Sequence, residues 1–467
     1  MNWTNKALAA LIGIALALAG CAHYPLNEPL AGNASEAAYR FEEQPPGTNT
    51  NELFVCLIFS GGGTRAAALS YGVLQKLRDT NIVWKGQTKR LLDEVDCISS
   101  VSGGAFTAAY YGLFGERVFQ DFRERFLDHD VESDLIGRAL SPVNWFRLAS
   151  PNFSRIDLAA EYYDETIFER KTFRALGEGG RRPFVIINST NMANGERFEF
   201  TQSEFNILGS ELGTYPVARA VAASSAFPFL LSPLSLKNYP APESVKITTD
   251  MRLGLDDFYT NRRRYQWAMN RVQYTDVAER PYVHLMDGGL ADNIGLRPIE
   301  AAYRRSSGFI RKLINDGKIE MFVLLIVNAR TEMQDQLSKN ESPPGLLTVA
   351  YKTATVALDN YSFESIELIK ELRDERTRAQ GVITTCQTRL DACPQAGKLP
   401  KFASDIQPYI VEVDFKALPD PERRKYFLSL PTNFRLSRSD VQKLVDVGGE
   451  LLAADPEFEQ LLKDLQQ

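Results

Sequence analysis

The feature that most constrains this 467-residue chain is a series of strand-like, mainly apolar runs, separated by stretches with helical spacing. The runs occupy residues 53–59, 95–101, 184–187, 284–286 and 321–327, and a further candidate lies at 409–415. Strands without polar alternation are buried on both faces, which is typical of parallel sheets covered by helices. The pattern therefore predicts an α/β fold.

The domain organisation follows from where this alternation stops. It continues to about residue 330, after which the sequence turns mostly helical around the candidate strand at 409–415. No internal repeat and no sharp change in composition separates the two parts. We therefore expect a catalytic core over residues 51–335 and a mostly helical C-terminal extension, residues 336–467, packed on it.

The first 20 residues are predicted to be an export signal rather than structure. Lys6 is followed by an apolar run from Ala7 to Gly20, which is too short to cross a hydrocarbon core of ~30 Å comfortably. The run ends in Leu18-Ala19-Gly20-Cys21, which resembles a bacterial lipobox, in which the cysteine is lipidated; an ordinary signal peptide is the alternative.

Residues 21–50, rich in Pro, Asn and Gly, predict a flexible tether. With Ala22 rather than Asp after Cys21, the sequence resembles lipoproteins sorted to the outer membrane. We expect a lipoprotein anchored to the membrane through Cys21, on the periplasmic face of the outer membrane.

Charge and histidine counts exclude several classes of function. The chain has 53 Lys and Arg against 59 Asp and Glu, so it lacks the basic footprint of a nucleic-acid-binding protein. It has only three histidines, His23, His129 and His284. A histidine-rich metal site is therefore not expected, and we predict neither a metal nor a cofactor.

Four cysteines remain besides Cys21. Cys386 and Cys393 flank a short polar loop and are candidates for a disulfide in an oxidising compartment. Cys56 and Cys97 lie in apolar runs, a position more typical of buried free thiols.

A glycine-rich turn follows the first run. Its residues, Gly61, Gly62, Gly63, Thr64 and Arg65, open a helical stretch, where backbone N–H groups favour an anion. A P-loop would need Lys and then Ser or Thr after its last glycine, and these are missing. A dinucleotide fingerprint fits only loosely, without the expected acidic residue downstream. The third interpretation is an oxyanion hole for acyl transfer.

A second turn, Ser100-Val101-Ser102-Gly103-Gly104, follows the second run. It is close to G-x-S-x-G, the nucleophile elbow that lifts a serine hydroxyl above a sheet, with Ser100 in place of the first glycine. The alternative is a helix cap without chemistry. The spacing makes Ser102 the candidate nucleophile.

A third turn, Asp287-Gly288-Gly289, follows the run that ends at 286. A Ser–His–Asp triad of the α/β-hydrolase kind needs a histidine after the acid, but the last histidine, His284, precedes Asp287. Along a strand, the two side chains would also point to opposite faces. The base for Ser102 is therefore expected to be a carboxylate, whose pKa partial burial would raise.

The three turns in this order resemble the patatin-like phospholipases and acyl hydrolases. Two further segments are similar to that family: Asn188-Ser189-Thr190 with Asn194-Gly195, and Ala222–Pro228. The resemblance covers roughly residues 52–330 and implies a three-layer α/β/α fold with a mainly parallel central sheet. It also implies a Ser102–Asp287 dyad, an acyl-enzyme intermediate and an oxyanion hole at the first turn.

The implied substrate is a phospholipid or other lipid ester, cleaved as by a phospholipase A. A thioesterase or lipase on the same site, or a non-catalytic membrane-tethered binding or assembly lipoprotein, are the alternatives.

For Arg65 we expect a role in bracing its loop through a neighbouring carboxylate, rather than in binding a lipid phosphate. Residues 135–148 are predicted to be a packed helix and loop, with a lid or interfacial segment as the alternative. Arg262–Trp267 are predicted to form a solvated helix face rather than a site for anionic headgroups.

Overall fold

The computed structural model describes residues 22–31, 39–50, 52–178, 182–228, 230–305, 307–332 and 407–466, with single residues and short helical pieces between 341 and 392. An eight-stranded sheet forms its centre, with the strand order β12-β11-β2-β5-β6-β10-β9 and β7 paired to β6. These strands are β2 (Leu53–Phe59), β5 (Val95–Val101), β6 (Phe184–Asn191), β7 (Arg197–Glu199), β9 (Leu234–Lys237), β10 (Tyr282–Asp287), β11 (Met321–Asn328) and β12 (Gln407–Asp414).

Four short strands lie outside this sheet: β1 (Glu28–Pro29), β3 (Asn81–Trp84), β4 (Gln87–Arg90) and β8 (Ser210–Glu211). The α-helices are α2 (Gly63–Arg78), α3 (Gly103–Phe114), α4 (Val118–Phe122), α5 (Val131–Ala139), α6 (Pro142–Leu148), α7 (Arg155–Thr166), α8 (Phe173–Glu178), α9 (Gln202–Ile207), α10 (Val217–Ser224), α11 (Glu243–Lys246), α12 (Thr249–Leu255), α13 (Arg262–Val272), α14 (Gly289–Asp292), α15 (Arg297–Arg304), α16 (Phe309–Asn315), α18 (Pro421–Leu428), α19 (Arg438–Ala454) and α20 (Pro456–Asp464).

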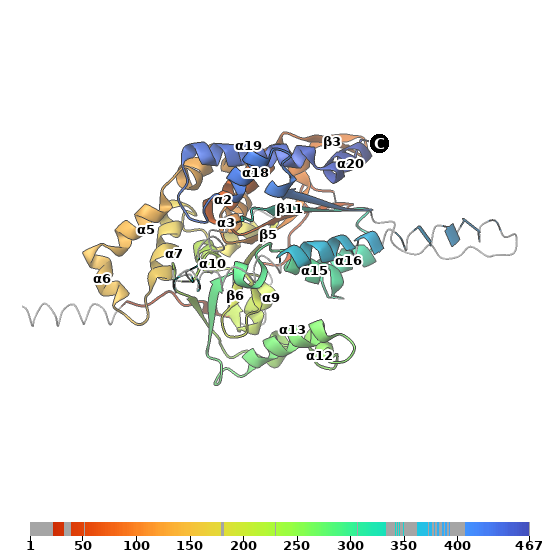
Figure 1. The fold of residues 1–467 in the computed structure, drawn as a ribbon. Helices are drawn as coiled ribbons and strands as arrows, with labels where there is room; N and C mark the ends of the chain where they lie inside the picture. Colours follow the sequence, from red (N-terminus) through yellow and green to blue (C-terminus); the bar gives the residue numbers. More distant parts are fainter. Residues whose placement is uncertain are drawn as a thin grey trace, which may run out of the picture.

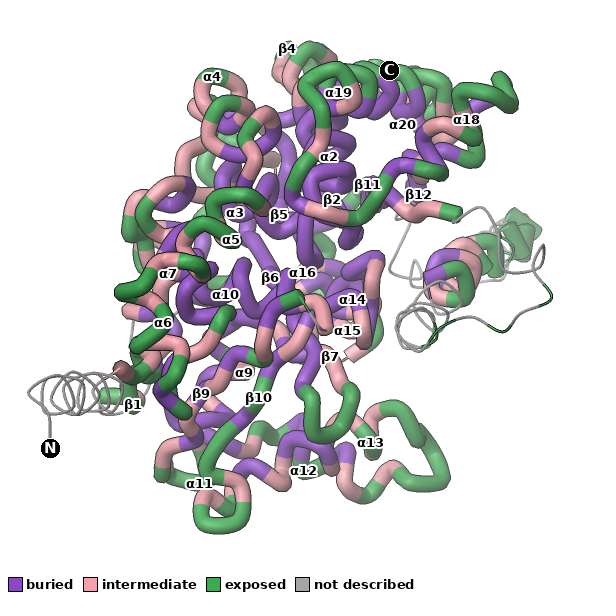
Figure 2. Tube along the Cα trace, turned by 60° about the vertical axis from the view of Figure 1, so that its left-hand side comes forward, coloured by how far each residue is buried: buried purple, intermediate pink, exposed green. Residues whose placement is uncertain are grey.

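Helices cover both faces of the sheet. Helices α2, α3 and α10 pack in sequence on one face, and α19 lies against α2 (Figure 1). On the other face, Tyr303 of α15 stacks on Phe322 of β11, and the ring of Phe309 of α16 lies 6.5 Å from that of Phe54 of β2. Figure 2 shows the buried residues concentrated in β2, β5, β6 and β11 and in the helices above them. The α/β/α fold is confirmed.

The sheet is parallel over β12, β11, β2, β5 and β6, as the uninterrupted runs predict. Strand β10 departs from the prediction, because it pairs antiparallel with both β6 and β9. Its side chains alternate between exposed and buried, and Tyr282 and His284 are exposed while Val283 and Leu285 are buried. The short run at 284–286 therefore belongs to a strand whose residues 282 and 284 face solvent.

The C-terminal part completes the sheet and one helical layer. Strand β12 pairs with β11 over eight residues. Helix α19 approaches α2 so closely that a Cβ on Gly72 would lie 2.1 Å from the carbonyl oxygen of Val445. The small residues of the two helices allow this contact.

The predicted flexible tether does not hold for all of residues 21–50, because some of the described residues pack on the core. The Asn27 amide donates to Ser210 Oγ at 2.8 Å, and β1 pairs with β8. Tyr39 and Phe41 are buried, and the Tyr39 hydroxyl donates to the Val185 carbonyl oxygen. These apolar side chains outweigh the turn-forming composition around them. Cys21 lies outside the described residues.

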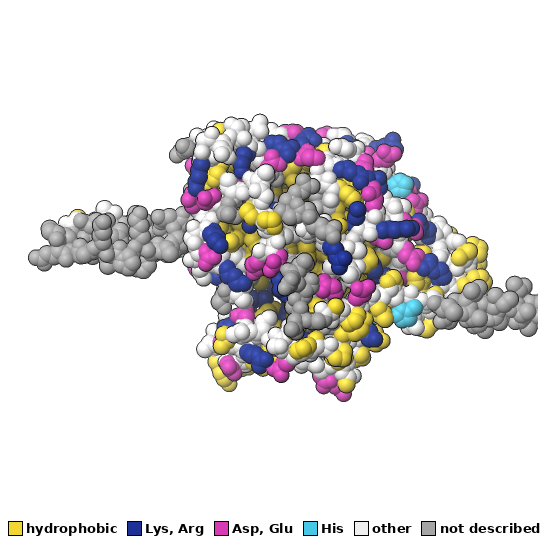
Figure 3. Space-filling model, turned by 180° about the vertical axis from the view of Figure 1, so that it is seen from behind, with side chains coloured by type: hydrophobic (Ala, Val, Ile, Leu, Met, Phe, Trp, Pro, Cys, Tyr) yellow, Lys and Arg dark blue, Asp and Glu magenta, His cyan; other side chains and the backbone are white. Residues whose placement is uncertain are grey.

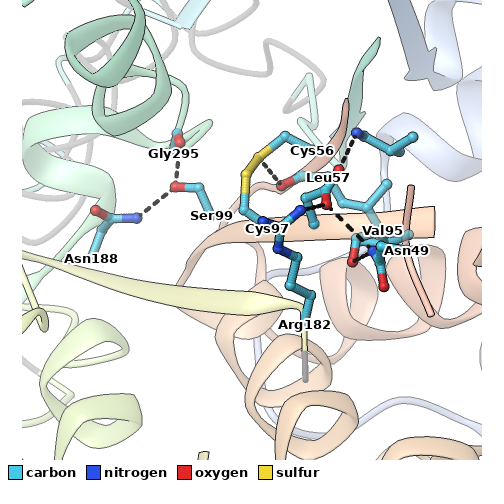
Figure 4. The surroundings of a disulfide bond; sticks show 11 residues. Asn49, Cys56, Leu57, Val95, Cys97, Ser99, Arg182, Asn188 and Gly295 are labelled. Atoms are coloured by element: carbon cyan, nitrogen blue, oxygen red, sulfur yellow. Dashed lines mark hydrogen bonds and ion pairs between the residues drawn. A yellow bond between two sulfur atoms is a disulfide. The ribbon is translucent and has the colours of Figure 1, made fainter. Parts of the chain in front are cut away.

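Two predictions about cysteines are also wrong. Cys56 and Cys97 are not free thiols, because they form a disulfide between β2 and β5, where they face each other in register (Figure 4). Cys386 is an exposed free thiol, at odds with the predicted Cys386–Cys393 pair, and Cys393 lies outside the described residues.

The prediction of a solvated helix face at residues 262–267 and that of a packed helix and loop at residues 135–148 have different outcomes. Arg262 and Arg263 are exposed, as predicted, whereas Arg264 pairs with Asp250 and Asp257. Residues 135–148 do not form a packed helix and loop: α5 and α6 protrude from the body (Figure 1), and within them only Val131, at the start of α5, is buried.

Candidate active site

Ser102 occupies a sharp turn between β5 and α3. Its φ is +49°, a left-handed conformation that a serine adopts only when its surroundings impose it. The small residues that follow make the turn possible, since a Cβ on Gly104 would lie 2.7 Å from the carbonyl oxygens of Phe59 and Ser60. This is the geometry of a nucleophile elbow, in which the serine stands at the N-terminus of a helix.

Ser100 does not prevent the elbow. Its hydroxyl is buried and donates to the carbonyl oxygen of Ile186 on the neighbouring strand, at 3.1 Å. The side chain thus adds a hydrogen bond to the neighbouring strand that glycine could not make. Ser100 is therefore directed into the sheet and away from the role of nucleophile.

The hydroxyl of Ser102 donates to Asp287 Oδ2 at 3.0 Å. The two residues lie 185 positions apart and come from the ends of β5 and β10. The antiparallel direction of β10 places Asp287 beside β6, opposite Ser189. A serine hydroxyl bonded directly to a carboxylate can lose its proton to that carboxylate when it attacks an electrophile.

Asp287 is almost completely enclosed, with 5% of its surface exposed. Burial raises the pKa of its carboxyl to about 7 from the usual 3.8, while the Gly289 N–H and the Ser102 hydroxyl, which donate to it, hold the pKa down. The Gly289 N–H donates to Oδ1 at 2.8 Å, which leaves Oδ2 for the serine. A carboxylate with this pKa is a stronger base than a solvated aspartate at neutral pH.

The first glycine-rich turn lies directly against the elbow. A Cβ on Gly103 would lie 2.0 Å from the carbonyl oxygen of Gly63, and a Cβ on Gly61 would lie 3.4 Å from the Cβ of Ser102. Gly62 and Gly63 both have positive φ, so their peptides take directions that other residues rarely adopt.

The N–H groups of this turn divide into engaged and available donors. The Gly61 N–H donates to the carbonyl oxygen of Asn293, and the Thr64 N–H to that of Asn433, both at 2.9 Å. In the described part of the chain, the N–H groups of Gly62 and Gly63 meet no acceptor. They are therefore the two donors of the turn that remain for an oxyanion.

Arg65 braces this loop through hydrogen bonds to two carbonyl oxygens and a hydroxyl. Its guanidinium is buried and donates to the carbonyl oxygens of Ala329 and Leu430 and to the hydroxyl of Thr432. These contacts join the start of α2 to the segments that follow β11 and α18. A lipid phosphate would have to displace them to reach Arg65.

Several further residues support the site. Ser224 and Thr190 belong to the two segments that resemble the family, whereas Asn293 was not singled out in the sequence. Ser224 Oγ accepts from the Ser102 N–H at 2.8 Å and donates to the Asn188 carbonyl oxygen at 2.6 Å. Thr190 Oγ1 donates to the Asp287 carbonyl oxygen at 2.8 Å. Asn293 bonds the first turn through its backbone, a contact for which the sequence offers no signal.

The three histidines are engaged elsewhere. His284 bonds Ser235 Oγ at 2.8 Å, His129 bonds Asp134 and His23 bonds the Tyr24 carbonyl oxygen. Among the described residues, no group of three or more His, Cys, Asp or Glu side chains is placed to hold a metal ion. No helix in the described ranges is both long and apolar enough to cross a membrane.

Solved structures of other proteins show some similarity to this chain. Human GIVD cytosolic phospholipase A2 is similar in structure, with a TM-score of 0.40 and 13% identity over 89% of this chain and 60% of that one. The chain thus spans less than two thirds of that enzyme. VipD from Legionella pneumophila is similar with a TM-score of 0.32 and 12% identity, over 94% of this chain and 71% of that one. No curated protein matches the sequence.

The family model for patatin-like phospholipase matches residues 57–303, more than half of the chain. That span contains the glycine-rich turn, Ser102 and Asp287. The chain belongs to the patatin-like phospholipase family.

Proposed function

We propose that this protein is a serine acyl hydrolase that cleaves lipid esters as a phospholipase A does, with Ser102 as nucleophile and Asp287 as base. The observation that carries the proposal is the 3.0 Å bond from the Ser102 hydroxyl to Asp287 at the elbow. The raised pKa of Asp287 supports it, because a general base works best with a pKa near the operating pH.

In the first half of the reaction, Asp287 takes the hydroxyl proton and Ser102 Oγ bonds to the ester carbonyl carbon. The negative charge that develops on the carbonyl oxygen is stabilised by the N–H groups of Gly62 and Gly63. Loss of one such donor typically costs about 2.7–4 kcal/mol. The ester C–O bond then breaks, and the leaving alcohol takes the proton from Asp287.

In the second half, Asp287 takes a proton from water, and the resulting hydroxide attacks the acyl carbon. The bond from that carbon to Ser102 Oγ breaks, the fatty acid leaves, and Asp287 returns the proton to the serine. Each proton moves through the same carboxylate, so no histidine is needed.

The test is labelling by a fluorophosphonate probe, followed by mass spectrometry of lipids released from phospholipid vesicles. Ser102→Ala should lose both labelling and lipid release. Ser100→Ala is the matched control, because Ser100 is the neighbouring buried serine with its hydroxyl committed to Ile186. Labelling that persists in Ser102→Ala would refute Ser102 as the nucleophile, whereas a wild type that neither labels nor releases lipid would favour a non-catalytic lipoprotein. Labelling with release only from thioesters or triglycerides would favour the thioesterase or lipase alternative.

We also propose that the protein is a lipoprotein anchored through Cys21 on the periplasmic face of the outer membrane. The Cys56–Cys97 disulfide supports export, because disulfides persist in oxidising compartments. Mass spectrometry of the N-terminal peptide should find an acylated Cys21, and membrane fractionation should find the protein with the outer membrane. An unmodified Cys21 would refute the anchor.

A further inference from the structure

Helices α5 and α6 form a protruding arm, defined here as residues 131–148, with an unusual distribution of side chains. Five large apolar side chains of the arm are exposed: Ile136, Leu140, Val143, Trp145 and Phe146. Val143 is 71% exposed and Trp145 56%. Figure 3 shows apolar side chains gathered at this end of the molecule. A cluster of this size on a soluble protein marks a surface that meets an apolar partner.

The two arginines of the arm form ion pairs with the body. Arg138 pairs with Glu165, and Arg147 pairs with Glu161, so both guanidinium groups are held by α7. These ion pairs hold the arm to α7. Val131 and Leu135 pack against the core, while the five apolar side chains named above remain exposed.

The start of the described chain lies at the base of this arm. The Ser150 hydroxyl donates to the Ala22 carbonyl oxygen at 2.6 Å, and the Tyr24 N–H donates to that of Asn152 at 2.7 Å. Cys21 directly precedes Ala22 in the sequence. A lipid on Cys21 would thus enter a bilayer beside the arm. This step rests on the lipidation proposed above.

The packed residues 22–31 make the anchor short. Through β1 and Asn27 they are bound to β8, so a bilayer that holds Cys21 also holds the domain close to its surface. Trp145, an aromatic side chain with a polar N–H, is of the type enriched at membrane interfaces.

The arm is also connected to the dyad through the loop that follows α10. In that loop the Ala226 carbonyl oxygen accepts from the Asp287 N–H at 3.0 Å. Further along, Ser232 Oγ bonds both Ser154 Oγ and the Ile156 N–H at the start of α7, next to the base of the arm. The loop therefore runs from the base of the arm to Asp287. A bilayer bound to the arm would lie at the end of the loop that is farther from Asp287.

We propose that the α5–α6 arm is a bilayer-docking surface, which inserts its exposed apolar side chains into the lipid interface beside the anchor at Cys21.

The test uses the chain from Ala22 onward, which contains every described residue and lacks the anchor. Binding to vesicles of phosphatidylethanolamine and phosphatidylglycerol is measured by flotation. Leu140→Ser/Val143→Ser/Trp145→Ser should lower the partition coefficient at least about tenfold. The matched control, Leu253→Ser/Tyr259→Ser, changes exposed apolar side chains of the α12–α13 region and should bind as the unchanged chain does.

A second measurement follows Trp145 directly. Its fluorescence should shift to shorter wavelength on addition of vesicles, and Trp145→Phe should abolish the shift. The docking proposal is overturned if the unchanged chain does not bind vesicles, or if the triple variant of the arm binds them as well as the double control variant does. A lipid-free dimer that the arm variant dissociates, without vesicle binding, would assign the surface to a second copy instead.

The docking proposal and the catalytic proposal can fail separately. The arm variant should hydrolyse a soluble short-chain ester at the normal rate, because none of its changes touches the dyad. Ser102→Ala should bind vesicles normally and hydrolyse nothing.

Discussion

Replacement of Asp287 by Asn tests whether burial gives this carboxyl its basicity, and it has two expected effects. Asparagine keeps an oxygen that can accept from the Gly289 N–H, but it cannot take a proton from Ser102. Ester hydrolysis should therefore be lost. The fold should at the same time become more stable above neutral pH, because the variant removes a carboxylate whose ionised form the site disfavours.

The size of the stability effect follows from the pKa. The Asp287 pKa is raised from 3.8 to about 7 on folding, and each unit corresponds to about 1.4 kcal/mol. Between these values the unfolded chain is ionised while the folded chain is protonated, so the wild-type protein loses stability as pH rises. Asp287→Asn should gain up to about 4 kcal/mol relative to the wild type above about pH 7 and nothing below about pH 4.

The wild-type rate should follow the same titration in the opposite sense, because the ionised form is the active one. With a pKa near 7, about 1% of Asp287 is ionised at about pH 5 and about 90% at about pH 8. The kcat/KM for a soluble ester should therefore fall about a hundredfold when the pH is lowered from about 8 to about 5. An aspartate with an ordinary pKa would lose less than about a tenth of its activity.

The assays are urea unfolding of both proteins at several pH values and stopped-time ester hydrolysis by the wild type. Asp414→Asn is the control, since burial raises its pKa to about 6 but it lies on β12, at the far edge of the sheet. That variant should keep the wild-type rate profile. A wild-type rate that is flat from about pH 5 to about pH 8 would refute the reasoning. So would a stability difference between Asp287→Asn and the wild type that does not change with pH.

Three further variants test the supports of the site. Gly103→Ala places a methyl group 2.0 Å from the Gly63 carbonyl oxygen and should lower kcat/KM by at least about a hundredfold in the ester assay. Arg65→Lys cannot reach three acceptors with one ammonium group, and urea unfolding should show a loss of about 2 kcal/mol. Cys97→Ala removes a cross-link to Cys56 that closes 41 residues, and the free energy of unfolding should drop by about 4 kcal/mol; no change on reduction of the wild type would contradict this.

The strands and the elbow were predictable because their signals are local. An uninterrupted run such as 53–59 excludes a half-solvated strand, and small residues around Ser102 permit only a few turns. The direction of β10 was not predictable, because apolarity says nothing about which end of a strand meets its neighbour. The Cys56–Cys97 disulfide depends on the register of β2 against β5, which also arises only when the sheet forms.

The N-terminal segment and the arm were misjudged for a different reason. Composition favoured a tether at 21–50, yet Tyr39 and Phe41 supply buried apolar surface that outweighs the turn residues around them. The arm contains enough apolar residues to predict packing. Whether such residues meet the core or the solvent depends on contacts with other helices, such as those of Arg138 and Arg147 with α7, which the local sequence does not give.

The three glycine-rich turns gain their meaning from contact with one another. Each is ambiguous alone, since a turn of this kind occurs in many folds. A side chain on Gly103 would collide with the Gly63 carbonyl oxygen, and the Gly61 N–H donates to Asn293, which follows the Asp287 turn. Each turn thus limits the residues that the others can hold. The order of the motifs in the sequence is therefore more specific than any one of them, because all three surround a single hydroxyl.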